Sequence, residues 1–327
     1  MTEVDLPDFG KKLGYHHQSL MIGSCFAENI GIWLQDHLLP VMVNPFGILY
    51  NPISIANCLD LLFTGKKFTR EDLFFANGVY NSFSHHSRFS DPDPVKMAEQ
   101  INTHAVKARH TLKNASHLFI TFGTSWVFEH KNNGDIVSNC HKLPSATFIR
   151  YRLPVERIAE RWIALIEKIR QFNPDLHLVL TISPIRHLKD GAHENQLSKS
   201  TLLLATDVLI SYFGKEVISY FPSYELVLDE LRDYRFYATD MKHLSDLAID
   251  LIREKFIASI MDKEGITILN EVDKILHALG HRPNISNDEI YISFINKQIE
   301  NIDQLRIKYP FADFSELAKK FIKKRSG

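Results

Sequence analysis

The stretch Leu20-Met21-Ile22-Gly23-Ser24-Cys25-Phe26-Ala27 decides how the rest of the chain is arranged. Its first three residues form a short apolar run, which is typical of a buried strand. Beyond the glycine, apolar residues recur with the spacing of one helix face, at Phe26, Ile30, Trp33, Leu34 and Leu38. The sequence therefore predicts a strand, a tight turn that carries Ser24, and a helix over residues 25–39 that Pro40 ends.

The position of Ser24 suits two different roles. At the start of a helix, free N–H groups and the positive end of the helix dipole favour negative charge. A serine nucleophile passes through an oxyanion, so such a place suits acyl transfer. The same residue also fits a purely structural role, in which Ser24 caps the helix and Gly23 makes the turn.

Composition limits the class of protein. The 327 residues are 45% hydrophobic and 24% charged, with a formal net charge of −1, which argues against a nucleic-acid partner or an anionic membrane surface. The chain has no run of about 18 apolar residues, so we expect no membrane span. No signal peptide is apparent, and we expect a cytoplasmic location.

The cysteines support the same location. Cys25, Cys58 and Cys140 are an odd and sparse set without the spacing of metal ligands. Such a set is typical of a protein from a reducing compartment. We expect no bound metal and no cofactor.

Strand-like and helix-like segments alternate through most of the chain. The expected strands are residues 20–22, 41–43, 117–122, 176–182 and 216–221, and the expected helices are 25–39, 52–63, 94–112, 154–172, 195–213 and 244–261. This alternation predicts an α/β fold, a three-layer α/β/α sandwich around a mostly parallel five-stranded sheet, over residues 1–262. Residues 126–129 and 135–139 flank an Asn-Gly pair and predict a small hairpin. Residues 263–327 are polar and helical, and we expect them to form a C-terminal helical appendage.

In a parallel sheet the binding site lies beyond the carboxyl ends of the strands. The loops expected there carry Ser24, residues 44–47, 123–126 and 183–187, and the pair Asp240 and His243. Asp240 and His243 are three residues apart at the entry to a helix, so the carboxylate is expected to accept the imidazole Nδ1–H. This arrangement leaves Nε2 free to take a proton from a nucleophile.

Several motifs together resemble the GSCFA family, which is named after residues 23–27, and beyond it the SGNH, or GDSL-type, hydrolases. The resemblance covers roughly residues 17–260. The motifs that carry it are Asn44-Pro45-Phe46-Gly47, Tyr50-Asn51-Pro52, His86-Ser87-Arg88-Phe89-Ser90, Gly123-Thr124-Ser125-Trp126, Ser183-Pro184-Ile185-Arg186-His187, Asn195-Gln196-Leu197-Ser198-Lys199, residues 220–225, residues 229–236, and Asp240 with His243.

The resemblance to SGNH hydrolases implies a catalytic triad. Ser24 matches the nucleophile, His243 the general base and Asp240 the residue that orients it. Cys25 is a rival nucleophile, since a thiol near a helix N-terminus can be activated. We expect it instead to be a small buried core residue.

The same resemblance implies an oxyanion hole that departs from the usual pattern. Its donors would be the N–H groups of Ser24 and Gly47 and the side chain of an asparagine in a Gly-x-Asn block. This chain has Gly123-Thr124-Ser125 there. Either Ser125 substitutes for the asparagine, another donor such as Asn44 supplies the hydrogen bond, or the chemistry has changed.

Other polar loop residues are candidates for binding substrate: His85, His86, Arg88, Thr124, Arg186 and His187. The histidines fit equally well as scattered loop residues, and each arginine as a partner of an acid near residues 229–233. Lys199 is expected on a helix beside the site.

Three functions fit these residues. The first is a serine esterase that cleaves an acyl ester through a Ser24 acyl-enzyme, with an acylated carbohydrate as one candidate substrate. The second is an acyltransferase with the same site, and the third is a non-catalytic binding protein with a degenerate oxyanion hole. The sequence alone does not identify the acyl group, the substrate or the oligomeric state.

Overall fold

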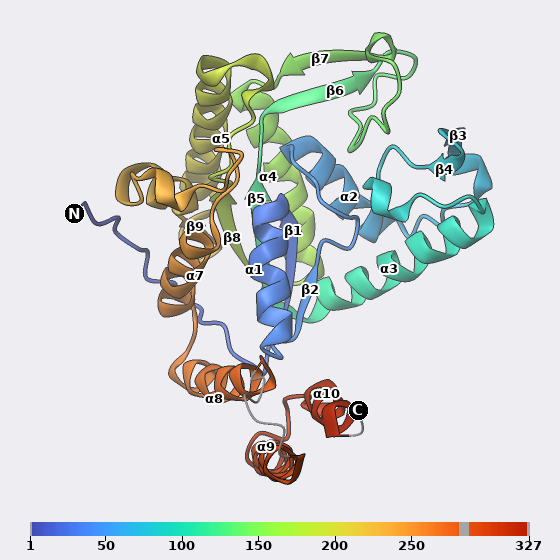
Figure 1. Ribbon diagram of the computed structural model, residues 1–327. Coiled ribbons are helices and arrows are strands. Elements are labelled where there is room, and N and C mark those ends of the chain that lie inside the picture. The colour runs from blue at the N-terminus through green and yellow to red at the C-terminus, as the bar shows by residue number, and fades with distance from the viewer. Residues whose placement is uncertain (1, 281–287, 326–327) are drawn as a thin grey trace.

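The computed structural model describes residues 2–280 and 288–325. At its centre is a parallel five-stranded sheet (Figure 1). The strands are β1 (Gln18–Gly23), β2 (Val41–Val43), β5 (Ala115–Phe122), β8 (His177–Ile182) and β9 (Ile218–Phe221), in the order β2-β1-β5-β8-β9. The α/β fold and the five-stranded sheet predicted from the sequence are confirmed.

The register of the sheet places the ends of four strands in one row. Gly23 pairs with Thr121, Thr121 with Thr181, and Thr181 with Phe221. The loops that follow these strands therefore leave the same edge side by side. β5 and β8 are buried along their whole length, as expected for inner strands that are covered on both faces.

Helices cover both faces, and alternate strand residues point to opposite sides. Met21, Phe119 and Val179 pack with α1 (Cys25–Asp36) and α7 (Asp246–Ile260). Their neighbours in the strands, including Ile22 and Ile120, pack with helices of the other face. Those helices are α2 (Pro52–Thr64), α3 (Pro94–Asn114), α4 (Val155–Phe172) and α5 (Ala192–Phe213).

Most predicted boundaries lie within one to three residues of those in the structure, and two local features need comment. Helix α1 ends at Asp36, short of Pro40, because the chain turns away at Leu38, which has a φ of 65°. The Asn-Gly turn forms, with the Gly134 N–H donating to the His130 carbonyl. The predicted pairing of 126–129 with 135–139 is present next to this turn: Glu129 bridges Ile136, and the Val137 N–H donates to the Phe128 carbonyl. The sequence did not predict the longer pairing, in which strand β6 (Trp126–His130) pairs along its length with β7 (Phe148–Arg152).

Short elements complete the fold around the sheet. A second hairpin consists of β3 (Phe74–Ala76) and β4 (Val79–Asn81), and α6 (Ser223–Glu225) leads into a π-helical turn at Leu226–Glu230. Turns of 3₁₀ helix lie at Arg70–Asp72, Ser87–Phe89, Ser145–Thr147, Leu188–Asp190 and Tyr234–Phe236.

The C-terminal residues form α8 (Lys263–Gly280), α9 (Asp288–Lys308) and α10 (Ser315–Arg325). They lie at the end of the molecule away from β6 and β7 (Figure 1). Val272, Phe314 and Phe321 belong to the same apolar core as Leu34 of α1, so these helices continue that core. The division into domains 1–262 and 263–327 stays a prediction. Within the described residues, no helix combines the length and apolar character needed to cross a membrane.

Candidate active site

The turn between β1 and α1 is held by its neighbours. Gly23 has a φ of 149°, and a Cβ there would lie 2.3 Å from the carbonyl oxygen of Thr121, so only glycine fits. Its N–H donates to the Asn44 Oδ1 at 2.9 Å, and the Ser24 N–H donates to the Thr121 carbonyl at 3.4 Å. These bonds fix the turn against the ends of β2 and β5.

Ser24 is the N-cap of α1. Its side-chain oxygen accepts the Phe26 N–H at 3.3 Å, and the residue is 1% exposed. No hydrogen bond joins Ser24 to His243 in the described part of the chain. The structural role weighed for Ser24 is therefore present, while its catalytic role stays a prediction.

A cavity of about 630 Å³ opens at the carboxyl edge of the sheet. Its lining comes from the start of α1, the loops after β2, β5 and β8, the β6–β7 hairpin and the loop before α7. These residues are Cys25, Tyr50, Asn51, Thr124, Trp126, Phe128, Val137, Ser138, Asn139, Cys140, Arg150, Ile185, Arg186, His187, Leu188, Lys189, Lys242 and His243. Cys25 and His243 thus line the same cavity, whereas Ser24 does not.

Cys25, the first residue of α1, lies half-buried at the base of this cavity. Burial raises the pKa of its thiol, and the carboxylate of Glu28 acts in the same direction. The N–H groups of Cys25 and Phe26 and the nearby Lys199 oppose this increase, because they stabilise the thiolate. The sequence analysis favoured a core position for Cys25 over the role of a rival nucleophile, and its contact with the cavity fits the rival role.

Asp240 and His243 form the hydrogen bond that their spacing predicts. The distance between His243 Nδ1 and Asp240 Oδ2 is 2.5 Å. The other carboxylate oxygen accepts the N–H groups of Lys242 and His243 at 2.9 Å each. The His243 side chain, followed by these N–H groups, holds the pKa of Asp240 well below its usual range. The imidazole is therefore oriented by the carboxylate and lies on the cavity wall.

Lys199 is a buried cation beside this cavity. It is 0% exposed, and its Nζ donates to the carbonyl oxygens of Gly123 and Ser183 at 2.6 Å each. These carbonyls follow the ends of β5 and β8, so the side chain ties the two strands together. No carboxylate in the described residues forms an ion pair with it. Burial lowers its pKa to about 7.

Three of the predicted substrate-binding residues line the cavity: Thr124, Arg186 and His187. The His187 ring packs edge-on against Tyr50, and burial lowers its pKa to about 4, with Lys199 and His243 adding to the effect. Its Nε2 is buried and has no hydrogen bond within the described residues. His187 is therefore a neutral imidazole near neutral pH.

The other three candidates lie outside the lining. His85 is enclosed by Phe46, Phe68 and Phe89, with its Nδ1 2.9 Å from the Ser82 hydroxyl, and burial lowers its pKa to about 3. His86 accepts the Arg88 N–H and caps a 3₁₀ turn. Arg88 pairs with Glu28 at 3.0 Å rather than with the acids near residues 229–233. These contacts give all three residues structural roles.

The predicted oxyanion donors are engaged within the protein. The Gly47 N–H donates to the Asn44 carbonyl at 2.8 Å, and the Asn44 Nδ2 lies 3.5 Å from Glu28. Ser125 is 0% exposed, because Ser198 of α5 fills the space beside it and bonds both its hydroxyl and its N–H. The structure therefore gives none of these three residues a free donor on the cavity wall.

Two family models match the chain. Residues 18–256 match the model described as the GSCFA family, and residues 272–324 match the model described as the GSCFA domain protein, C-terminal domain. The chain belongs to the GSCFA family. None of the curated proteins compared with this GSCFA protein matches it.

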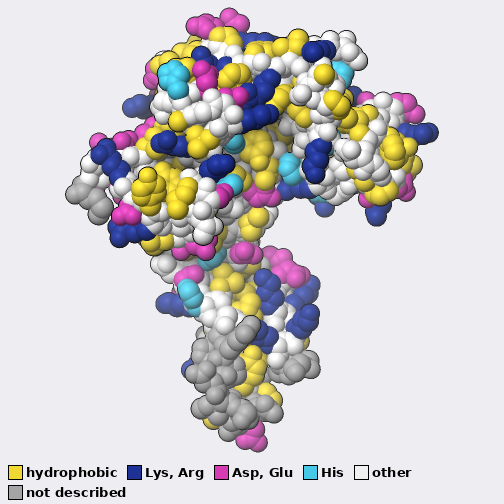
Figure 2. Space-filling model, turned by 45° about the horizontal axis from the view of Figure 1, so that its top comes forward, with side chains coloured by type: hydrophobic (Ala, Val, Ile, Leu, Met, Phe, Trp, Pro, Cys, Tyr) yellow, Lys and Arg dark blue, Asp and Glu magenta, His cyan; other side chains and the backbone are white. Residues whose placement is uncertain are grey.

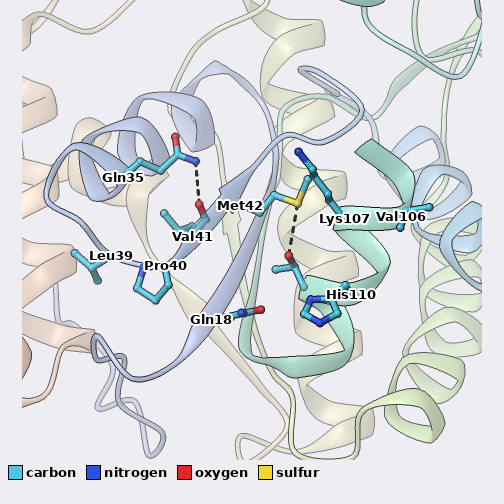
Figure 3. A pocket seen from close by; sticks show the side chains of 10 residues that line it. Gln18, Gln35, Leu39, Pro40, Val41, Met42, Val106, Lys107 and His110 are labelled. Carbon is cyan, nitrogen blue, oxygen red and sulfur yellow. Dashed lines mark hydrogen bonds between the residues drawn. The ribbon is translucent and has the colours of Figure 1, made fainter. Parts of the chain in front are cut away.

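A second cavity, of about 620 Å³, lies at the amino ends of β1 and β2, against α3 (Figure 3). Its wall contains Gln35, which donates to the Val41 carbonyl, and Thr111, which donates to the Met42 sulfur. Its ionisable lining residues are Lys107 and His110, without a carboxylate to orient the imidazole. Among the described residues, no three His, Cys, Asp or Glu side chains could together hold a metal ion. The carboxyl-edge cavity is therefore the better candidate site of this GSCFA protein.

Lys199 is the site residue whose importance the sequence showed least clearly. In α5, Asn195, Ser198 and Leu202 form one buried stripe, and Lys199 lies on it. A lysine at a buried helix position is unusual, because its charge must leave water. A lysine among the buried positions of α5 was therefore the feature of the sequence that could have marked Lys199 as a site residue.

Proposed function

We propose that this GSCFA protein is an acyl-ester hydrolase that works through a covalent acyl-enzyme. The observation that carries the proposal is the shared cavity of Cys25 and His243, with Asp240 hydrogen-bonded to the far nitrogen of the imidazole. A nucleophile, a base and a residue that orients the base are the parts required for acyl transfer. The resemblance to SGNH hydrolases supports the same chemistry.

We infer that Cys25, rather than Ser24, is the nucleophile. The thiol lines the cavity, whereas the Ser24 hydroxyl is buried and accepts a helix N–H. Attack by Ser24 would require the cap of α1 to open. Cys25 needs no such change, and the charge of Lys199 favours its thiolate.

The reaction follows from these positions. The Cys25 Sγ attacks the ester carbonyl while His243 Nε2 takes the thiol proton. The imidazolium then gives this proton to the leaving alcohol oxygen as the C–O bond breaks and a thioester remains. Water attacks the thioester, His243 takes its proton and returns it to the sulfur, and the free acid leaves. As the first residue of α1, Cys25 has an N–H without a helical acceptor, and this N–H is suited to bind the oxyanion.

Hydrolysis of p-nitrophenyl acetate tests the assignment. We expect Cys25→Ala and His243→Ala to lower kcat/KM by about 100-fold or more. Ser24→Ala should keep most of the activity and lose about 1 kcal/mol of unfolding free energy, because it removes a cap. Cys58→Ala, at a buried thiol outside the cavity, is the matched control. Full activity of Cys25→Ala together with an inactive, folded Ser24→Ala would make the serine the nucleophile.

The acyltransferase and binding-protein alternatives predict different products. A transferase would form a new ester when a sugar or another alcohol is added, at the expense of free acid. A binding protein would turn over neither substrate and would leave Cys25 unacylated. Product analysis in the presence and absence of the acceptor separates these three functions.

A further inference from the structure

The charged side chains of the candidate active site are of one sign. Arg150, Arg186, Lys189 and Lys242 line the cavity, and no Asp or Glu is among its described lining residues. Figure 2 brings the carboxyl edge of the sheet forward and shows Lys and Arg side chains gathered on this face. The net charge of the whole chain is only −1, so this excess of basic side chains is specific to the cavity.

Internal ion pairs account for only part of this charge. Arg150 forms a two-pronged pair with Asp190, with Nη2 2.5 Å from Oδ2, and stacks on Trp126 at 4.3 Å. Asp240, in the same loop as the lining residues Lys242 and His243, is hydrogen-bonded to His243. Within the described residues, Arg186, Lys189 and Lys242 form no ion pair. Three cations of the cavity lining therefore have no carboxylate within ion-pair distance among the described residues.

Arg186 is the most informative of the three. It is partly buried on the loop after β8, and its charge lowers the pKa of both Lys199 and Tyr224. Its guanidinium lines the cavity and pairs with no carboxylate of the described residues, so it is available to an anionic ligand. The planar guanidinium is suited to bind the two oxygens of a carboxylate or a phosphate.

Aromatic residues of the cavity lining offer the rest of a binding surface. Trp126 and Phe128 of β6 line the cavity, and Arg150 and Lys189 pack on their rings. The Trp126 Nε1 is buried and has no hydrogen bond within the described residues. The apolar body of a ligand could pack on these aromatic residues while an anionic group of the same ligand pairs with the cations. A neutral sugar ester would leave the three cations without an anionic partner.

We propose that the substrate is an anionic ester, in which a phosphate or carboxylate group on the same molecule binds Arg186 with Lys189 and Lys242 while the acyl group reaches Cys25. This inference rests on the proposed function for the reaction. The anion site itself depends only on the cations of the cavity, so it can be tested without turnover.

The first experiment measures rates with three matched esters. These are methyl 4-acetoxybenzoate, which is neutral, 4-acetoxybenzoate, which carries a carboxylate, and 4-acetoxyphenyl phosphate. We expect the wild-type protein to favour one or both anionic esters by about tenfold or more in kcat/KM, since a charged hydrogen bond has that effect. The better of the two anionic esters identifies the group. Added salt should reduce the preference.

The same comparison is made with Arg186→Gln, Lys189→Gln and Lys242→Gln. Arg186→Gln should lower kcat/KM on the favoured anionic ester about tenfold more than on the neutral ester. The matched control is Arg170→Gln, at an exposed arginine in the last turn of α4. It should leave all three rates unchanged. Equal rates on the three esters in the wild-type protein would overturn the inference.

The second experiment measures binding of phenyl phosphate and of benzoate to Cys25→Ala by isothermal titration calorimetry. We expect at least one of these anions to bind, and the double variant with Arg186→Gln to bind it about tenfold more weakly. Arg186-dependent binding without any ester hydrolysis would refute the proposed function alone. Ester hydrolysis with neither Arg186-dependent binding nor a preference for anions would refute the anion site alone.

Discussion

At the scale of single residues, Lys199 is the clearest departure from ordinary core chemistry. Among the described residues, its side chain donates hydrogen bonds to the carbonyl oxygens of Gly123 and Ser183. Burial favours the neutral amine, the positive charge of Arg186 acts in the same direction, and a thiolate at Cys25 would oppose both. The Lys199 amine therefore loses its proton near neutral pH.

The lowered pKa of Lys199 predicts how the free energy of unfolding depends on pH. Its pKa is about 7 in the folded protein and 10.5 in the reference state, so between these values the unfolded chain binds more protons. The free energy of unfolding should therefore rise with pH across that window. Below about pH 7 the cost of burying the charge is fully present.

Lys199→Met isolates this effect. The variant should be more stable than wild type near pH 7, and its advantage should shrink as the pH approaches 10.5. Urea denaturation of both proteins at several pH values across the window measures the difference. The comparison is repeated in the Cys25→Ala background, because the charge of Lys199 acts on the pKa of the Cys25 thiol. Parallel stability curves for the two proteins would show that Lys199 is charged in the fold.

At the scale of elements, the β1–turn–α1 unit depends on Gly23. Gly23→Ala combines a backbone at a φ of 149° with a Cβ that would lie 2.3 Å from a main-chain oxygen. Gly78 has a φ of 81° with nothing within 4 Å of its added Cβ, so Gly78→Ala reports the cost of the backbone alone.

We expect Gly78→Ala to cost about 1 kcal/mol of unfolding free energy, and Gly23→Ala to cost about 3 kcal/mol or more or to prevent folding. Urea denaturation and soluble yield measure both. Equal small losses at the two positions would mean that the turn tolerates a side chain and does not fix Cys25.

Among the helices and strands, the sequence predicted helix α4 well and the pairing of β6 poorly. Helix α4 has Ile158, Trp162 and Ile169 on one buried side, as its strong periodicity predicts. The β6–β7 pairing was missed because the Asn-Gly turn is a local signal and says nothing about a partner strand beyond residue 147. The contacts that accompany this pairing, such as Arg150 on the Trp126 ring, are tertiary.

At the scale of the whole molecule, the C-terminal helices lie at the end away from β6 and β7 (Figure 1), whereas residues of β6 and β7 line the cavity. Phe321 of α10 is 1% exposed in the core that these helices share with α1. Phe321→Ala should therefore cost about 3 kcal/mol of unfolding free energy and change kcat/KM by less than about twofold. Lys320→Ala, at an exposed neighbour, is the control. A large loss of activity in a folded Phe321→Ala would show that the helices act on the site.

The sequence predicted the layout of the molecule better than the detail of its site. Alternating strands and helices identified the sheet, and the sheet identified the edge where Asp240 and His243 lie. The choice between Ser24 and Cys25 depends on which side chain faces the cavity. These residues are neighbours at a tight turn, and the sequence pattern does not show which of the two side chains faces it. The use of Gly47, Asn44 and Ser125 depends on partners far away in the chain, such as Ser198, that no local pattern reveals.

The central claim is that Cys25 carries the acyl group. Peptide mass spectrometry of protein that is acid-quenched during turnover of p-nitrophenyl acetate tests it most directly. The account predicts one acetyl group on Cys25, sensitive to hydroxylamine as a thioester, and absent from Cys25→Ala. An acetyl group on Ser24, or continued hydrolysis with residues 23–27 unmodified, would contradict it.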